Sequence, residues 1–165
     1  MSDQKEDIQS IVTPTHLQYA WAATGAQADF LTRIAEGKLI GQRCPMCSMV
    51  YCPPSGSCAR CGAETTEVVE VQDRGTVTTF CIVRVPSENI DVKLPYCAAN
   101  ILLDGSDMPF TALLQECEAE DVRIGMRVEA VWKDRSEWGP TFENIAYFRP
   151  TGEPDVPAEE LGVWV

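Results

Sequence analysis

The sequence lacks most of the patterns by which common enzyme classes are recognised. It has a single histidine, His16, so a Ser–His or Cys–His catalytic pair would have to use that residue. No Gly-x-Ser-x-Gly, P-loop or Gly-x-Gly-x-x-Gly pattern is present. Its densest acidic run, Glu116–Asp121, reads as a solvated loop. We therefore expect no catalytic residues in this chain.

Long apolar runs are also missing. No stretch approaches the roughly 20 residues of a membrane-spanning helix, so we expect no membrane association. The first segment, MSDQKEDIQS, is polar and mixes both signs of charge, unlike a secretory signal. These observations predict a cytoplasmic protein.

Basic residues are scarce. The 165-residue chain has 13 Lys and Arg against 25 Asp and Glu, which gives a formal net charge of −12. A surface this acidic repels phosphate backbones and lacks the electrostatic footprint of a nucleic-acid binder. It favours solubility, or a partner with basic patches. We therefore expect no nucleic-acid partner.

Cysteine, in contrast, is abundant and paired. Two Cys-x-x-Cys pairs, Cys44 with Cys47 and Cys58 with Cys61, stand ten residues apart. Each pair can form a tight knuckle, and two facing knuckles supply the four thiolates that a structural zinc ion binds. In a chain without a signal peptide, such spacing favours metal over a disulfide scaffold. Four protein thiolates close the coordination shell, so we expect a structural metal.

Iron is the rival metal, because the same thiolates form rubredoxin-like sites in electron carriers. The colour of the purified protein separates the two metals. Among the remaining cysteines, Cys81 and Cys97 read as small buried hydrophobes on strands. Cys52 reads as a partly exposed bystander, and Cys117 is ambiguous. No base or electropositive pocket is visible beside them, so none is expected to be a nucleophile.

Helix signals are confined to the N-terminal part of the chain. Thr13 and Pro14 are suited to start a helix that runs to about Ala23. A second helix is expected over Ala26–Glu36, with Gly37 as its C-terminal cap.

After the cysteines the pattern changes to short strands separated by turns. The clearest strand is Thr76–Val85, whose odd-numbered residues from Val77 to Val85, Cys81 among them, alternate onto one face. Five or six antiparallel strands make a small barrel, and a five-stranded OB barrel with its long curved strand at Gly75–Val85 fits best. The other expected strands are 66–72, 95–103, 110–115, 127–133 and 141–147.

The aromatic residues divide along the same line. Those on predicted strands are expected in the core: Phe80, Phe110, Phe142, Tyr147 and Phe148. Those on helices or loops either form a protein interface or pack the helices on the barrel: Tyr19, Trp21, Trp138 and Trp164.

The order of these parts resembles the DUF35 family. The segments that carry the resemblance are FLTRIAEGKLIGQRCPMC, CPPSGSCARCG, IGMRVEAVWK and FENIAYFRP, within residues 14–150. All four cysteines of the family pattern are present, while Ser48 replaces the glycine usual after the second cysteine. The resemblance implies a mainly β chain: N-terminal helices, a rubredoxin-like zinc ribbon and an OB-fold barrel. The expected segments are a flexible lead at 1–12, helices at 13–43, the ribbon at 44–63, the barrel at 64–150 and an extended tail at 151–165.

The resemblance also implies a function. Family members accompany thiolase-like proteins, including thiolases and aldolases, and some sit with MaoC-type hydratases in steroid side-chain breakdown. We therefore expect a non-catalytic, zinc-binding subunit of a hetero-oligomer whose thiolase-like large subunit acts on a CoA thioester. One version is a retro-aldolase in steroid side-chain degradation.

Two alternatives belong to other classes. A free-standing acyl-CoA-binding module would hold the phosphates with basic residues, namely Arg74, Arg84, Arg123 and Arg127. A nucleic-acid binder is the other, because zinc ribbons and OB barrels both occur in that role, although the net charge opposes it.

Overall fold

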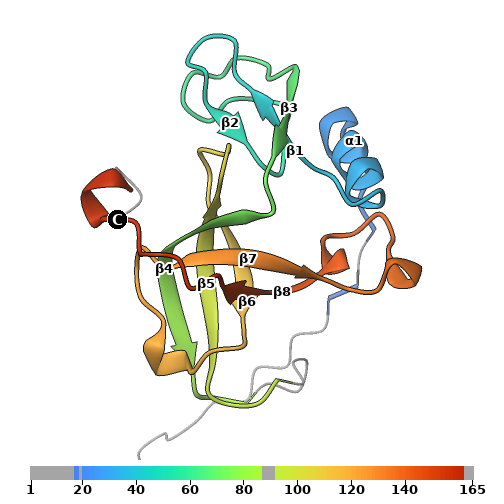
Figure 1. The fold of residues 1–165 in the computed structure, drawn as a ribbon. Coiled ribbons are helices and arrows are strands. Elements are labelled where there is room, and N and C mark those ends of the chain that lie inside the picture. Colours follow the sequence, from blue (N-terminus) through green and yellow to red (C-terminus); the bar gives the residue numbers. More distant parts are fainter. Residues whose placement is uncertain (1–16, 19, 87–91, 162–165) are drawn as a thin grey trace, which may run out of the picture.

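A computed structural model of the chain describes residues 17–18, 20–86 and 92–161. A small sheet stands above a barrel, with a helix beside them (Figure 1). The small sheet has the order β2-β1-β3 and consists of β1 (Leu39–Arg43), β2 (Val50–Tyr51) and β3 (Glu67–Val71). The closed barrel consists of β4 (Arg74–Val83), β5 (Tyr96–Leu103), β6 (Phe110–Leu114), β7 (Arg127–Trp132) and β8 (Ile145–Pro150). The expected fold class, mainly β with a five-stranded OB-like barrel, is confirmed.

The barrel closes in the order β4-β5-β6-β8-β7, with β4 pairing on both sides. Gly75 lies where β4 approaches β5, and a Cβ there would lie 2.4 Å from the Leu102 carbonyl oxygen. Glycine is thus required at the start of the long strand. The last strand begins later than the sequence predicts, because a 3₁₀ turn, η3 (Phe142–Asn144), precedes β8.

A bulge in β4 makes the core assignment of Cys81 wrong. The register against β5 shifts between Val77 and Thr79, so one extra residue is inserted into the strand. Such an insertion exchanges the faces of all later residues. Cys81 is therefore exposed opposite Ala98, and the pattern of alternation expected along the strand fails. Phe80, also expected in the core, is 37% exposed.

One helix, α1 (Gly25–Ile34), is present in the described part of the chain. Its end follows the sequence prediction: Gly37 has φ +81°, and the Lys38 N–H donates to the Arg33 carbonyl at 3.0 Å. The described residues of the earlier predicted helix, 17–18 and 20–23, are not helical. His16 and Tyr19 lie outside the described residues. No described helix has the length and apolar character needed to cross a bilayer.

The helix is fixed to the barrel through Asn144, which is fully buried. Its side-chain N–H₂ donates to the Ile34 carbonyl at 3.0 Å and to the Gly139 carbonyl at 2.8 Å. The Trp138 ring also packs against Gly37, just after the helix, since a Cβ atom on Gly37 would lie 2.5 Å from that ring. Trp138 therefore serves packing between helix and barrel, one of the two roles expected for it.

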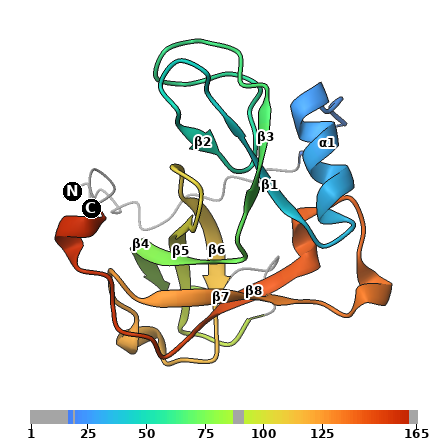
Figure 2. The ribbon, with the colours of Figure 1, turned by 45° about the horizontal axis from the view of Figure 1, so that its top comes forward.

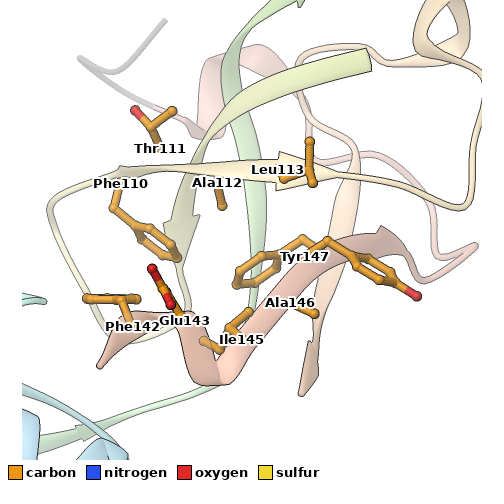
Figure 3. A pocket seen from close by; sticks show the side chains of 10 residues that line it. Phe110, Thr111, Ala112, Leu113, Phe142, Glu143, Ile145, Ala146 and Tyr147 are labelled. Atoms are coloured by element: carbon orange, nitrogen blue, oxygen red, sulfur yellow. The ribbon is translucent and has the colours of Figure 1, made fainter. Parts of the chain in front are cut away.

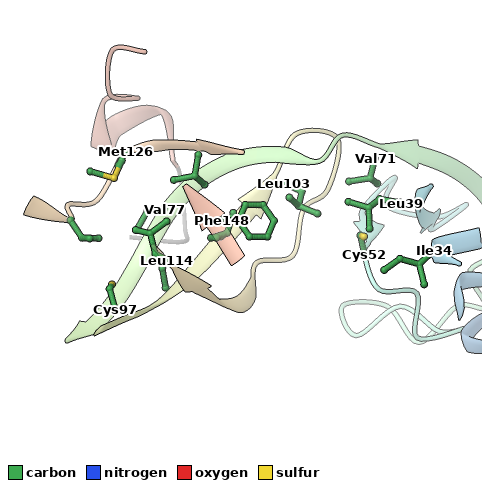
Figure 4. Close-up of a cluster of buried hydrophobic side chains, with 14 of the residues drawn as sticks. Ile34, Leu39, Cys52, Val71, Val77, Cys97, Leu103, Leu114, Met126 and Phe148 are labelled. Atoms are coloured by element: carbon green, nitrogen blue, oxygen red, sulfur yellow. The ribbon is translucent and has the colours of Figure 1, made fainter. Parts of the chain in front are cut away.

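Apolar side chains run without interruption from the helix and small sheet into the barrel (Figure 4). Ile34, Leu39 and Cys52 lie on the side of the helix and small sheet, at the right of Figure 4, and Phe148 lies in the barrel. Cys52 is 1% exposed, so its assignment as a partly exposed bystander is wrong. Cys97 is buried on β5, as predicted. The two β units therefore share one core.

The tail after β8 follows the barrel surface. The Val156 N–H donates to the Gly125 carbonyl at 2.8 Å, and Glu153 pairs with Arg74 at 2.8 Å. Leu161 is buried after a short 3₁₀ turn, η4 (Ala158–Glu160). The final apolar residues, 162–165 with Trp164, lie outside the described residues. Two further 3₁₀ turns are η1 (Ala119–Asp121) and η2 (Arg135–Glu137).

Candidate metal centre

Both Cys-x-x-Cys pairs close the same kind of turn. The Ser48 N–H donates to the Cys44 carbonyl and the Gly62 N–H to the Cys58 carbonyl, each at 2.9 Å. Both residues after the second cysteine are left-handed, with φ +62° at Ser48 and +70° at Gly62. Ser48 thus keeps the knuckle conformation for which glycine is suited, at a backbone cost of about 1–2 kcal/mol.

The two knuckles bring four sulfur atoms into one cluster. The Sγ atoms of Cys44 and Cys61 are 3.4 Å apart, and those of Cys47 and Cys58 are 3.5 Å apart. All four lie within 4.8 Å of one another. Zn–S bonds of about 2.3 Å place tetrahedral sulfurs about 3.8 Å apart, so the cluster fits a zinc ion. These four cysteines are the residues that would hold it.

Tyr51 on β2 supports the cluster from the side. Its hydroxyl accepts from the Ala59 N–H at 3.1 Å and lies 3.2 Å from the Cys58 sulfur, to which it can donate. This hydrogen bond is the main cause that lowers the pKa of Cys58 to about 6. The Ala63 backbone favours the Cys61 thiolate, but the sulfurs of Cys44 and Cys58 raise the pKa of Cys61 to about 12. The Tyr51 hydroxyl therefore favours the thiolate form of Cys58, which is the form that binds a metal ion.

The cluster is suited to hold an ion with a closed coordination shell. In the described ranges, these cysteines form the only close group of potential metal ligands found. Cys44 and Cys58 are buried, Cys47 is half-exposed and Cys61 is exposed. Because four thiolates complete a tetrahedral shell, no position is left for substrate or water.

A loop from the barrel forms hydrogen bonds with the strand that carries Tyr51. The Asp107 N–H donates to the Val50 carbonyl at 2.9 Å, and the Val50 N–H donates to the Asp107 carboxylate at 2.8 Å. Met108 packs against the cysteine cluster. Figure 2 shows this loop between β5 and β6 reaching the sheet above the barrel. The strand that carries Tyr51 is therefore joined to the barrel by hydrogen bonds, and its residue Val50 also takes part in the shared core.

Comparison with known proteins identifies both halves. Residues 32–67 match the family model "ChsH2, rubredoxin-like zinc ribbon domain", and residues 68–133 match "ChsH2, C-terminal OB-fold domain". A "DUF35 domain-containing scaffold protein" of Methanocaldococcus jannaschii is 36% identical over 102 residues, which are 61% of this chain and 72% of that protein. The chain belongs to the DUF35 family. A DUF35 scaffold protein of Pyrococcus furiosus is 30% identical over 101 residues, covering 61% of this chain and 73% of the relative.

Solved DUF35 structures have the same fold. The structure titled "Ltp2-ChsH2(DUF35) aldolase" superposes with a TM-score of 0.58 at 23% identity, over 79% of this chain and 98% of that one. A DUF35 protein of unknown function from Sulfolobus solfataricus gives a TM-score of 0.57 at 17% identity, over 76% and 84% of the two chains. At these identities the likeness concerns the fold alone.

The arginines proposed for phosphate binding in this DUF35 protein are all engaged elsewhere. Each pairs with a carboxylate of the chain: Arg74 with Glu153, Arg84 with Glu120, Arg123 with Asp155 and Arg127 with Asp104. They do not converge on a shared open site. Burial raises the pKa of Cys117, and of Cys97 to about 11, so neither thiol is activated.

Sequence reasoning missed the residues that hold the centre in place. Tyr51, Asp107 and Asn144 carry no spacing signal of their own, and each acts on a segment distant in sequence or across a turn. Asn144 follows the charged Glu143 and precedes Ile145, so even there the sequence offers no signal for a buried polar contact.

Proposed function

We propose that this DUF35 protein is the non-catalytic, zinc-binding subunit of a hetero-oligomer with a thiolase-like large subunit. In the proposal the large subunit carries the catalytic residues and the complex acts on a CoA thioester. The finer form is a cytoplasmic retro-aldolase in steroid side-chain degradation, with a MaoC-type hydratase as a further partner.

The closed four-cysteine cluster is the observation that carries the proposal. The ribbon that carries it is joined to the barrel through Val50 and Asp107, and an ion bound by all four cysteines would have no open ligand position. A ribbon and barrel joined in this way are suited to hold another protein in place and have no open metal position for chemistry. Curated relatives are named scaffold proteins, and the solved neighbour is titled an aldolase.

We further propose zinc as the metal, held by Cys44, Cys47, Cys58 and Cys61. When bound, zinc would link the two knuckles and contribute folding free energy; it would supply no reaction chemistry. Metal analysis of purified protein should give one zinc per chain and a colourless solution. A red protein that contains iron would overturn this assignment.

Co-expression with a thiolase-like protein from the same genome tests the subunit role. We expect the two proteins to elute together in size-exclusion chromatography, and cleavage or condensation of the CoA thioester to require both. If they never co-purify and the large protein is fully active alone, the proposal fails.

A free acyl-CoA-binding module is less well supported, because the four arginines it would need are paired internally. Calorimetry of the isolated chain with CoA thioesters separates the two functions. A subunit that only helps to complete a site should bind these compounds weakly when alone.

A further inference from the structure

The barrel wall is held together least where β6 meets β8. Strands β6 and β8 pair at a single position, Leu114 with Phe148, and then diverge. The gap is an apolar groove of about 350 Å³ (Figure 3). Phe110 and Ala112 approach it from β6, and Ile145 and Tyr147 from β8. We call the groove and the adjoining edge of β6 the seam.

The edge of β6 that borders the seam is bridged to β8 at one end only. The Gln115 N–H donates across to the Phe148 carbonyl at 2.9 Å, so it points toward β8. Because backbone direction alternates along a strand, the N–H and C=O groups of Leu113 and Thr111 point the same way. The parallel bridge of Leu114 with Phe148 uses the Leu113 carbonyl, and within the described residues no bridge to β8 uses the Leu113 N–H or the backbone groups of Thr111. By the same alternation, the N–H and C=O groups of Ala112 and Leu114 point toward β5.

The rim of the seam carries a carboxylate, that of Glu143, which forms no ion pair with any described residue. Glu143 lines the groove and is exposed. Glu116, in contrast, is held by the Tyr147 hydroxyl at 2.6 Å and by Arg149 at 3.5 Å. A segment entering the seam would therefore meet an apolar floor, free strand hydrogen-bonding groups and one free carboxylate.

We propose that the seam binds an extended segment of the partner protein, which adds to β6 as a further strand. Its chemistry follows from the seam: apolar side chains at alternate positions to enter the groove, and a Lys or Arg to meet Glu143. An acyl chain would fill the groove but offer no hydrogen bonds to the Leu113 N–H and to the N–H and C=O groups of Thr111. Strand addition satisfies both, and is an established mode of peptide recognition. This inference rests on the proposed subunit function.

Amide hydrogen exchange resolved to single residues tests the proposal in the co-purified complex. In the free chain, the amides of Thr111 and Leu113 should exchange fast while those of Ala112 and Leu114 are protected. In the complex, Thr111 and Leu113 should slow by about tenfold or more, to the level of their neighbours. If the complex forms and both amides still exchange fast, the seam proposal fails although the subunit function stands. Absence of any complex would defeat the subunit function itself.

Two variants give an independent readout. Leu113→Pro removes one seam-facing N–H and spares the bonds to β5, so it should weaken the complex about tenfold or more. Ala146→Asp places a charge in the groove and should act similarly without touching the β6 backbone. Ala158→Asp, on an exposed turn of the tail, is the matched control and should leave affinity unchanged.

Three outcomes would overturn the proposal. Folded Leu113→Pro and Ala146→Asp proteins with unchanged affinity would show that the partner does not use the seam. A concentration-dependent homodimer that protects the same amides without the partner would assign the seam to a second copy of this chain. Protection caused by a long-chain acyl-CoA alone would assign the groove to an acyl chain.

Discussion

Tyr51 is the side chain that connects the metal cluster to the ribbon's own fold. Replacing it with phenylalanine keeps the ring and removes the hydroxyl between Cys58 and Ala59. Loss of such a supporting hydrogen bond typically lowers metal affinity about 10- to 100-fold. We expect Tyr51→Phe to show that loss in competition with a chelator of known affinity. Tyr147→Phe, which removes a hydroxyl on the barrel, is the control, and equal affinities in all three proteins would contradict the role given to Tyr51.

Ser48 has a left-handed backbone conformation, which destabilises the folded protein for every residue type except glycine. Ser48→Gly removes that cost but adds flexibility to the unfolded chain, so we expect a net gain in stability of about 0.5–1 kcal/mol. Thermal melting of the metal-bound protein would show a higher midpoint. Ser57→Gly, at a bridge position opposite Glu64, has no such strain to relieve and should not raise the midpoint. A lower midpoint for Ser48→Gly would show that the Ser48 side chain stabilises the protein by more than its left-handed backbone conformation costs.

At the scale of elements, the sequence predicts helix α1, strand β3 and the barrel strands to within a few residues. The prediction fails in β4, where one inserted residue changes the face on which each later residue of the strand lies. The bulge after Val77 depends on how β4 bends to pair with both β5 and β7, which no local pattern records. Cys81 consequently faced inward in the prediction and faces outward in the protein. The four cysteines were predictable because their spacing alone places them together.

The β5–β6 loop is the element that couples ribbon and barrel, and Asp107 is its main contact. Asp107→Ala leaves the Val50 N–H without its side-chain acceptor, which should cost about 1–2 kcal/mol. We expect faster amide exchange at Val50 and a lower melting midpoint, with Asp107→Asn close to wild type because it retains an acceptor. An unchanged exchange rate at Val50 would mean that the shared core alone couples the two units.

For the whole molecule, metal removal is the decisive perturbation. Without the ion, the two knuckles lose their link, and the strand held by Asp107 loses its support. We expect a strong chelator, or Cys44→Ser, to unfold the ribbon or separate it from the barrel and to abolish association with the partner. Circular dichroism and size-exclusion chromatography before and after adding zinc back would show this. A metal-free protein that stays folded and still supports full activity of the complex would contradict it.

Parts of the molecule that depend on long-range contact were beyond prediction. The helix docks through Asn144 and Trp138, which lie more than a hundred residues further along the chain than Ile34 and Gly37. The ribbon docks through Asp107, 57 residues from Val50. Pattern and propensity describe each element alone, so they could order the parts but could not place one against another.

The arginine pairs on the surface have a further consequence, for the speed of association. Seven of the nine arginines, which are Arg33, Arg43, Arg74, Arg84, Arg123, Arg127 and Arg149, already pair with carboxylates of the same chain. The excess acid that remains acts at long range, so a partner with a basic face would be drawn in by the field before any contact forms. Its rate of encounter should then fall steeply as ionic strength rises, while the lifetime of the formed complex changes much less.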